Sequence, residues 1–299
     1  MRLLLPVLLL STGCSLSKIG MHAIAWQAHR TGMEAHTLVA GEHTVRYWMG
    51  GQGPPVLLIH GFGGDGLATW SRQLDDFTAE HTVIVPDLLW FGASHSQAQP
   101  TLTHQAEAQL ALLDALELTA VDVVGISYGG FVTLRLYQLA EDRFNRLVIV
   151  DSPGPLFSDE DAEALADRFG VAEPEELFVP QTPAAVGALI GLAYYEEKHY
   201  PRFLLRDIQR NLFADHHDAL RGLLADLSTN RDLLAPSTLT VPPASLVVWG
   251  SHDRVFPPPI GASLAELLDA ELVTIQQAAH APQIERPESF NQAVLEYLR

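Results

Sequence analysis

The chain has 299 residues, 47% of them hydrophobic, and its 18 Lys and Arg against 36 Asp and Glu give a formal net charge of −18. That length is enough to bury a full core, either as one α/β domain with an insertion or as two domains. The acidic balance argues against nucleic acid or an anionic membrane surface as the main partner, and it is typical of a solvated acidic surface. Cys14 is the only cysteine, so an intrachain disulfide is excluded and the core must hold the fold.

The first residues have the pattern of an export signal. Arg2 precedes an apolar run from Leu3 to Leu10, which is too short to span a bilayer, and small residues then lead to Cys14. The stretch resembles a bacterial lipoprotein signal, which implies removal of residues 1–13 as a signal peptide and a lipid on Cys14. Ser15 after the cysteine implies a lipid-anchored protein of the bacterial cell envelope, at the outer rather than the inner membrane. A soluble secreted or periplasmic protein and an uncleaved apolar start are the alternatives.

Residues 14–34 are predicted to form a tether and a short amphipathic helix over 21–30. The first part of the core, 35–154, alternates apolar runs typical of buried strands with amphipathic helices. The predicted strands are 37–40 and 44–49, which form a hairpin, then 56–59, 82–85, 121–124 and 146–150, and the predicted helices are 71–79, 103–116 and 128–139. This alternation predicts an α/β fold with a mostly parallel, doubly wound sheet, whose ligands bind at the carboxyl ends of its strands.

Residues 155–236 are predicted to be an all-helical cap over that edge of the sheet, inserted before the last two strands. Its helices are predicted at 159–169, 182–194, 200–213 and 218–227. Some of its large apolar side chains could line an acyl pocket, although most are expected in the cap's own core: Phe157, Phe178, Leu189, Ile190, Leu192, Tyr194, Tyr195 and Phe203. The last part of the core, 237–299, is predicted to hold strands 244–249 and 271–275 and helices 260–268 and 287–298.

One turn carries a candidate nucleophile. The apolar run that begins at Val121 reaches Gly125-Ile126-Ser127-Tyr128-Gly129 and continues as a helix. A strand that turns at once into a helix strains the residue at the turn and needs small neighbours, which Gly125 and Gly129 supply. The Ser127 hydroxyl is then exposed at the head of a helix, where unpaired N–H groups favour negative charge. A glycine-rich turn without a catalytic role is the alternative.

The strand over 56–59 ends in a glycine-rich stretch, residues 60–66. Closely spaced glycines let backbone N–H groups approach a ligand, as in an oxyanion hole, although they also suit a flexible loop. The second donor of such a hole comes from the residue after the nucleophile. We therefore predict that the amides of Phe62 and Tyr128 form the hole, with Gly63 as the substitute donor.

A serine hydroxyl is a poor nucleophile at neutral pH and needs an imidazole base, which a carboxylate must hold in turn. Of the 13 histidines, His280 follows the last predicted strand, at the edge where Ser127 lies. His60 is predicted instead to tie down its own loop. The acid is predicted to be Asp253, after the penultimate strand, which gives the order Ser, Asp, His, and Asp151 is the alternative.

The motifs that matter together are Gly125-Ile126-Ser127-Tyr128-Gly129, His60-Gly61-Phe62-Gly63, Pro86-Asp87-Leu88, Trp249-Gly250 with Asp253 and Pro257, and His280. They resemble the α/β-hydrolase fold family, especially its esterase and lipase members with a helical cap, and the resemblance covers nearly everything after residue 35. It implies hydrolysis of carboxylic esters through an acyl-enzyme, without a cofactor. It disfavours haloalkane dehalogenase and epoxide hydrolase, whose nucleophile is an aspartate.

One departure from the family is Leu89-Trp90, where Pro-Gly is often found. The change touches no triad member but can reshape the pocket rim, so Trp90 is predicted to contact the substrate together with Phe62 and Tyr128. The expected substrate is a small-molecule ester with an apolar acyl group.

Other reactions use the same triad: a lactonase, a C–C-bond hydrolase and a cofactor-free haloperoxidase remain open, because pocket shape decides among them. A ligand-sensing module with slow turnover is a further alternative. No metal site is predicted, since the adjacent His216 and His217 would point in different directions on a helix and no H-E-x-x-H or C-x-x-C pattern occurs. No glycine pattern marks a dinucleotide or P-loop site.

Overall fold

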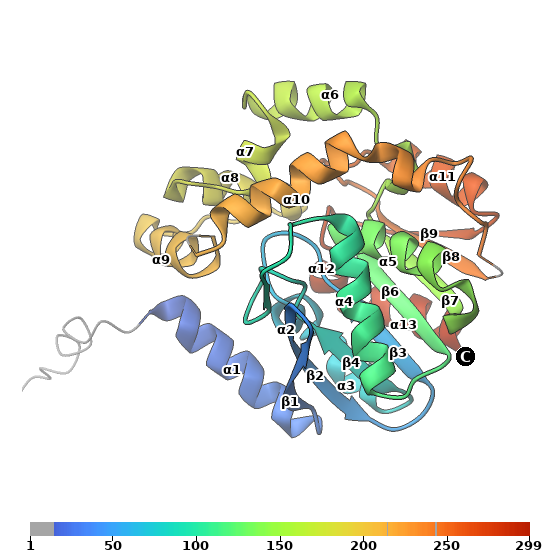
Figure 1. Ribbon diagram of the computed structural model, residues 1–299. Coiled ribbons are helices and arrows are strands. Elements are labelled where there is room, and N and C mark those ends of the chain that lie inside the picture. The colour runs from blue at the N-terminus through green and yellow to red at the C-terminus, as the bar shows by residue number, and fades with distance from the viewer. Residues whose placement is uncertain (1–14, 214, 243) are drawn as a thin grey trace, which may run out of the picture.

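The computed structural model describes residues 15–213, 215–242 and 244–299 (Figure 1). The predicted signal over 1–13 and the predicted lipidation site Cys14 therefore lie outside the described residues. Within those ranges, no helix has both the length and the apolar character that crossing a membrane requires.

A sheet of nine strands runs through the described part of the chain, in the order β1-β2-β4-β3-β6-β7-β8-β9, with the short β5 paired to β2. Strands β4, β3, β6, β7, β8 and β9, which are neighbours in this order, are parallel to one another. Strands β1 and β2 form an antiparallel hairpin, and β2 also pairs with β4 in the antiparallel direction. The prediction of a mostly parallel sheet is confirmed. The bounds are β1 Glu34–Ala40, β2 His43–Gly51, β3 Pro55–Ile59, β4 Thr82–Pro86, β5 His95–Ser96, β6 Val121–Ile126, β7 Phe144–Val150, β8 Ser245–Gly250 and β9 Glu271–Ile275.

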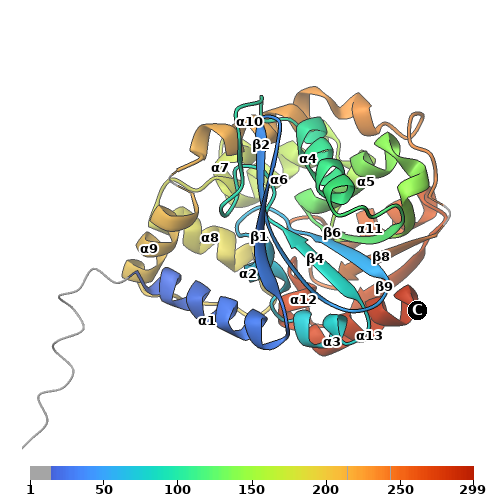
Figure 2. The same ribbon diagram turned by 60° about the horizontal axis from the view of Figure 1, so that its bottom comes forward.

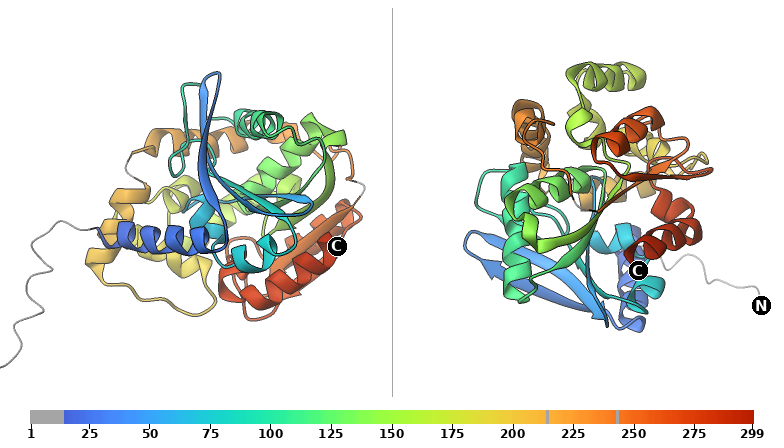
Figure 3. Two further views of the ribbon diagram at one scale, coloured as in Figure 1. Left: turned by 90° about the horizontal axis from the view of Figure 1, so that it is seen from below. Right: turned by 90° about the vertical axis from the view of Figure 1, so that its right-hand side faces the viewer.

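Helices cover both faces of the sheet, as Figures 2 and 3 show. Successive residues of the central strands point to opposite faces, so Leu57 and Ile59 of β3 join one apolar core while Val56 and Leu58 join the other. Strands buried on both faces need this continuous apolar sequence. The first core is completed by α4 (Leu102–Ala115), α5 (Tyr128–Leu139) and α11 (Pro258–Leu267), and the second by α1 (Leu16–Arg30), α2 (Gly66–Trp70), α3 (Leu74–Thr78) and α13 (Pro287–Leu298).

The segment between β7 and β8 forms a helical cap above the sheet (Figure 1). Its described residues contain no strand, in keeping with the all-helical insertion expected from the sequence. Its helices are α6 Asp159–Phe169, α7 Pro174–Phe178, α8 Pro183–Ala193, α9 Arg202–Leu212 and α10 His217–Thr229.

Polar contacts fasten one end of the cap to the core. Glu285, at the end of α12 (Pro282–Glu285), accepts hydrogen bonds from the backbone N–H groups of Tyr195 and Ala279, both at 2.7 Å. The Arg254 guanidinium donates to the carbonyl oxygens of Tyr194 and Tyr195 at 3.2 and 3.3 Å. The cap is therefore anchored to the two loops that follow β8 and β9.

Three short helices and the two-residue strand β5 are elements that the sequence pattern did not indicate, whereas the short α3 lies within the helix predicted over 71–79. Helices α2, α7 and α12 have only five, five and four residues, too few for a helical period to show. Helix α2 begins inside the predicted glycine-rich loop because the Asp65 side chain caps it, accepting from Ala68 N–H at 2.7 Å. Helix α1 begins at Leu16, earlier than the predicted start at 21, because the Ser15 hydroxyl caps it.

Candidate active site

Ser127 lies at the junction of β6 and α5, with a backbone φ of 54°. A positive φ is strained for any residue other than glycine, and here close packing enforces it. A Cβ atom on Gly125 would lie 2.4 Å from the Gly129 carbonyl oxygen, and a Cβ on Gly129 would lie 2.4 Å from that of Ile59. Both glycines are thus required by the close approach of strand and helix, as the sequence motif indicated.

The hydroxyl of Ser127 meets an imidazole and a carboxylate. The Oγ atom of Ser127 is 2.9 Å from His280 Nε2, and His280 Nδ1 is 2.8 Å from Asp253 Oδ2. The Asp253 side chain is fully buried, and that of His280 is 11% exposed. The structure therefore brings together the three residues that the sequence analysis selected, from chain positions as far as 153 residues apart.

Backbone donors fix the orientation of Asp253. Its Oδ1 atom accepts from the N–H groups of Val255 at 2.7 Å and Phe256 at 3.1 Å. Its other oxygen, Oδ2, is left to accept from the His280 Nδ1–H. This arrangement sets the tautomer that leaves Nε2 free to take a proton from Ser127.

A second buried carboxyl group lies behind this relay. Asp151, in the loop after β7, accepts from Gly250 N–H at 2.8 Å through Oδ1, while its Oδ2 is buried without a partner among the described residues. Burial, and then the charge of Asp253, raise the pKa of Asp151 well above its ordinary value. A raised pKa favours the protonated form of Asp151, and Asp253 is the residue bonded to His280.

The same three residues, Asp151, Asp253 and His280, are also the group within the described chain whose ligand atoms are near enough for a metal ion, within 4.8 Å of one another. Their donor set suits a cation less well than it suits a proton relay. Asp253 and His280 already bond to each other, and the raised pKa of Asp151 disfavours the charged form that a metal ion needs. The absence of a metal site stays a prediction.

The amides of Phe62 and Tyr128 remain the predicted oxyanion donors. Gly61, which precedes Phe62, packs so closely on the nucleophile that a Cβ there would lie 2.9 Å from Ser127 Cβ. Among the described residues, neither the Phe62 nor the Tyr128 backbone N–H has a hydrogen-bond acceptor. Tyr128 also begins α5, whose dipole favours negative charge at this end.

His60 holds the oxyanion loop to its neighbour. Its Nδ1 lies 2.7 Å from the Gly61 carbonyl oxygen, and its Nε2 accepts from Leu88 N–H at 2.9 Å. Burial lowers the pKa of His60 to about 4, so the ring is neutral. The side chain acts on the loop rather than on Ser127.

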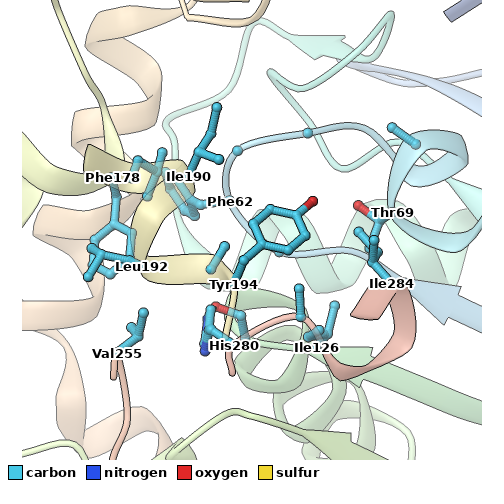
Figure 4. Close-up of a pocket in the computed structure, with 18 of the residues that line it drawn as sticks. Phe62, Thr69, Ile126, Phe178, Ile190, Leu192, Tyr194, Val255, His280 and Ile284 are labelled. Carbon is cyan, nitrogen blue, oxygen red and sulfur yellow. The ribbon is translucent and has the colours of Figure 1, made fainter. Parts of the chain in front are cut away.

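A cavity of about 290 Å³ opens beside Ser127, between the sheet edge and the cap (Figure 4). Figure 4 shows the ring of Tyr194 reaching across it, between His280 and Thr69. The walls contain no lysine, arginine, aspartate or glutamate, so an apolar group fits them. The cap contributes Phe178, Val186, Leu189, Ile190, Leu192, Ala193, Tyr194, Ile208 and Phe213.

A smaller cavity of about 50 Å³ also reaches Ser127. Phe62, Ser127 and Phe178 line both cavities, and Tyr128 lines the smaller one. The nucleophile therefore lies between two compartments of different size.

Some predicted contacts lie elsewhere. Trp90 lines neither cavity: it has a φ of 67° and is buried in the core, so the predicted substrate contact is not found. Tyr195 and Phe203 also line neither cavity, and Phe203 is 63% exposed.

Sequence reasoning missed other residues. Thr69 and Ile284 line the larger cavity from α2 and α12, and Glu285 joins the His280 loop to the cap. No motif marks them, because their roles depend on short helices that the sequence pattern did not reveal.

The chain matches the model of the alpha/beta hydrolase family over residues 56–293. It belongs to that family. It is 32% identical over 261 residues to the dihydrolipoyllysine-residue acetyltransferase component of the acetoin cleaving system of Pseudomonas putida, covering 84% of this chain but only 65% of that protein. It is 28% identical over 263 residues to a 2-hydroxymuconate semialdehyde hydrolase of Pseudomonas putida, covering 83% and 88% of the two chains. A crystal structure of a bacterial membrane phospholipase A has the same fold, with a TM-score of 0.77, 21% identity, and 94% and 91% of the two chains covered.

Proposed function

We propose that the protein is a serine hydrolase that cleaves carboxylic esters through an acyl-enzyme. The observation that carries the proposal is the chain of short contacts from Ser127 Oγ to His280 to Asp253, at 2.9 and 2.8 Å, at the mouth of an apolar cavity. The family supplies the hydrolase fold, and the walls of the cavity support a substrate with an apolar acyl group.

In the first half-reaction, His280 Nε2 removes the Ser127 proton as Oγ attacks the ester carbonyl carbon. The amides of Phe62 and Tyr128 bind the oxyanion of the tetrahedral intermediate, each contributing about 3 kcal/mol to the rate. His280 then gives the proton to the departing alcohol. Water repeats the sequence on the acyl-enzyme, and the acid is released with Ser127 regenerated.

Steady-state kinetics with a p-nitrophenyl ester series of increasing acyl length test the proposal. Ser127→Ala should lower kcat by about 10⁴-fold or more at every length, because the nucleophile is lost. The matched control is Ser263→Ala, an exposed serine of α11 that lines neither cavity. Ester turnover that survived Ser127→Ala would refute the proposal.

C–C-bond hydrolysis is a second candidate, because one relative at 28% identity is a 2-hydroxymuconate semialdehyde hydrolase. The larger cavity favours the ester reaction, since none of its lining residues offers a positive charge to an anionic substrate. Assaying purified protein with 2-hydroxymuconate semialdehyde beside p-nitrophenyl butyrate compares the two. Faster turnover of the semialdehyde would replace the ester proposal.

We also propose that a lipid on Cys14 anchors the protein in the bacterial cell envelope, at the outer membrane. Support comes from α1, which follows this cysteine. Its exposed side chains include Leu16, Ile19 and Trp26, at helical spacing, while its other side packs on the protein. Such a stripe suits the surface of a bilayer. Helix α1 also carries Lys18 and Arg30 but no acidic residue.

Fractionation of cells that express wild type and Cys14→Ser tests the anchor. Wild type should partition with membranes and incorporate labelled fatty acid, while Cys14→Ser should lose the label and become extractable by salt. A Cys14→Ser protein that remained firmly in the membrane fraction would count against acylation.

A further inference from the structure

The smaller cavity differs in chemistry from the larger one. Six of its lining residues are aromatic, and the only charged lining residue is Glu175 of α7. The aromatic residues are Phe62, Tyr128, Phe131, Phe157, Phe178 and Phe256.

The Glu175 side chain is half-buried, and one of its carboxylate oxygens has no partner among the described residues. Its Oε2 atom is buried, and among the described residues nothing donates a hydrogen bond to it and no ion pair includes it. Arg231, which lies over the Phe157 ring at 5.6 Å, is paired with Asp159 at 2.6 Å instead. A buried carboxylate oxygen without a partner is unfavourable, and a positively charged ligand would relieve that penalty.

Aromatic rings bind cations through the negative charge on their faces, so rings and a carboxylate together select a positive charge. A quaternary ammonium fits better than a primary one. Its methyl groups can pack on the aromatic rings, which make up six of the twelve lining residues, whereas each of the three N–H donors of a primary ammonium needs an acceptor.

The size agrees. The cavity is small, at about 50 Å³, so the cationic group that it takes must be a compact one such as trimethylammonium. The net charge of −18 also raises the concentration of cationic substrates around the protein.

We propose that the smaller cavity is a subsite for a quaternary ammonium group on the ester substrate, with Glu175 as its counter-charge. The inference rests on the proposed ester hydrolysis. Since Ser127, Phe62 and Phe178 border both compartments, one ester can place its apolar part in the larger cavity and its cationic part in the smaller one.

The kinetic test compares butyrylcholine with 3,3-dimethylbutyl butyrate, an uncharged ester of the same shape. Wild type should favour the choline ester in kcat/KM by about tenfold or more. Glu175→Gln should remove most of that preference while leaving kcat/KM for the uncharged ester within about twofold. Glu176→Gln, an exposed neighbour on the same helix, is the matched control and should retain the preference.

The cation can belong to the acyl side instead of the alcohol side. A second pair, the ethyl esters of 3-(trimethylammonio)propanoate and of 4,4-dimethylpentanoate, tests that arrangement with the same variants. A preference for the charged member in either pair that depends on Glu175 supports the proposal. Equal treatment of charged and uncharged members in both pairs, or a preference unchanged by Glu175→Gln, overturns it.

A binding measurement tests the subsite independently of the proposed reaction. In the Ser127→Ala background, calorimetry with tetramethylammonium should show binding that Glu175→Gln weakens by about tenfold, and an added primary ammonium should compete poorly. If no ester is turned over but this binding is found, the proposed reaction fails and the subsite stands. If uncharged esters are hydrolysed but tetramethylammonium does not bind, the subsite fails and the reaction stands.

Discussion

The two sides of the larger cavity are built differently. On the sheet side, Ser127, Asp253 and His280 stand at the carboxyl ends of β6, β8 and β9, and backbone hydrogen bonds fix the carboxylate. On the cap side, α7 to α9 present apolar side chains, tied to the core through Glu285 and Arg254. The sheet therefore sets the chemistry, whereas the cap sets which substrate reaches it.

The largest expected effect is on the sheet side. Asp253→Asn should lower kcat by about 10⁴-fold for every ester, because the imidazole loses both its tautomer and its counter-charge. Asp151→Asn makes the same change one strand away, on a carboxyl whose raised pKa favours the neutral form, and should stay within about tenfold of wild type. Steady-state kcat values compare the two. A larger loss for Asp151→Asn would make Asp151 the acid.

Glycine-to-alanine substitutions should change the free energy of unfolding in opposite directions on the two sides of the cavity. Gly125→Ala should lower the free energy of unfolding by about 3 kcal/mol, since the new Cβ would lie 2.4 Å from the Gly129 carbonyl oxygen. Gly191→Ala, in α8 of the cap, meets nothing within 4 Å. It should raise the free energy of unfolding by about 0.5–1 kcal/mol. Urea denaturation measures the free energy of unfolding of both variants. Equal changes in the two would contradict the difference between the sheet side and the cap side.

Lowering the pH should reduce the stability of the folded protein through His60, on the sheet side of the cavity. Its pKa is about 4 in the folded protein, against an ordinary value of 6.5, so the unfolded chain binds more protons between these values. Stability from this group is present above pH 6.5 and is lost as the pH falls to 4, by about 3 kcal/mol in total. His60→Gln keeps an acceptor for Leu88 N–H but does not titrate.

The measurement is the difference in unfolding free energy between wild type and His60→Gln, followed from pH 7 to pH 4. This comparison removes the opposite effect of Asp87, whose pKa burial and the charge of Asp65 raise to about 7, because both proteins keep it. The advantage of wild type should shrink by about 3 kcal/mol on acidification. A constant difference would mean that His60 titrates normally.

A change on the cap side should redistribute substrates rather than abolish turnover. Leu189 lines the larger cavity, and Leu189→Phe should shift the kcat/KM ratio of butyrate to hexanoate esters by about tenfold toward the shorter chain. Phe203→Leu, on an exposed side chain outside the cavity, is the control and should leave the ratio unchanged. A uniform drop in kcat for all chain lengths with Leu189→Phe would contradict the claim that the cap selects the substrate while the sheet carries the chemistry.

The same contrast explains what could be predicted from the sequence. The parallel strands and the positions of Ser127, Asp253 and His280 followed from local patterns, because apolar runs and glycine spacing record strand burial and tight turns directly. Long helices also followed, and α6 and α13 have the predicted bounds.

The cavity walls could not be predicted in that way. Which side of α8 or α9 faces Ser127 depends on packing between segments that are distant in sequence, so Leu189 and Phe203 looked alike although one lines the cavity and the other is exposed. Trp90 was misplaced because its burial in the core depends on packing that its local sequence does not record. Glu175 gave no signal, since one glutamate in an acidic segment resembles a solvated residue.

The most direct test of the central claim is to trap the acyl-enzyme. Wild-type protein mixed with p-nitrophenyl butyrate and quenched in acid within milliseconds should carry a butyryl group on the peptide that contains Ser127, as mass spectrometry would show. Ser127→Ala should carry none. Turnover with a butyryl group on another residue of the cavity, or with labelling that persisted in Ser127→Ala, would contradict the assignment of Ser127 as the nucleophile.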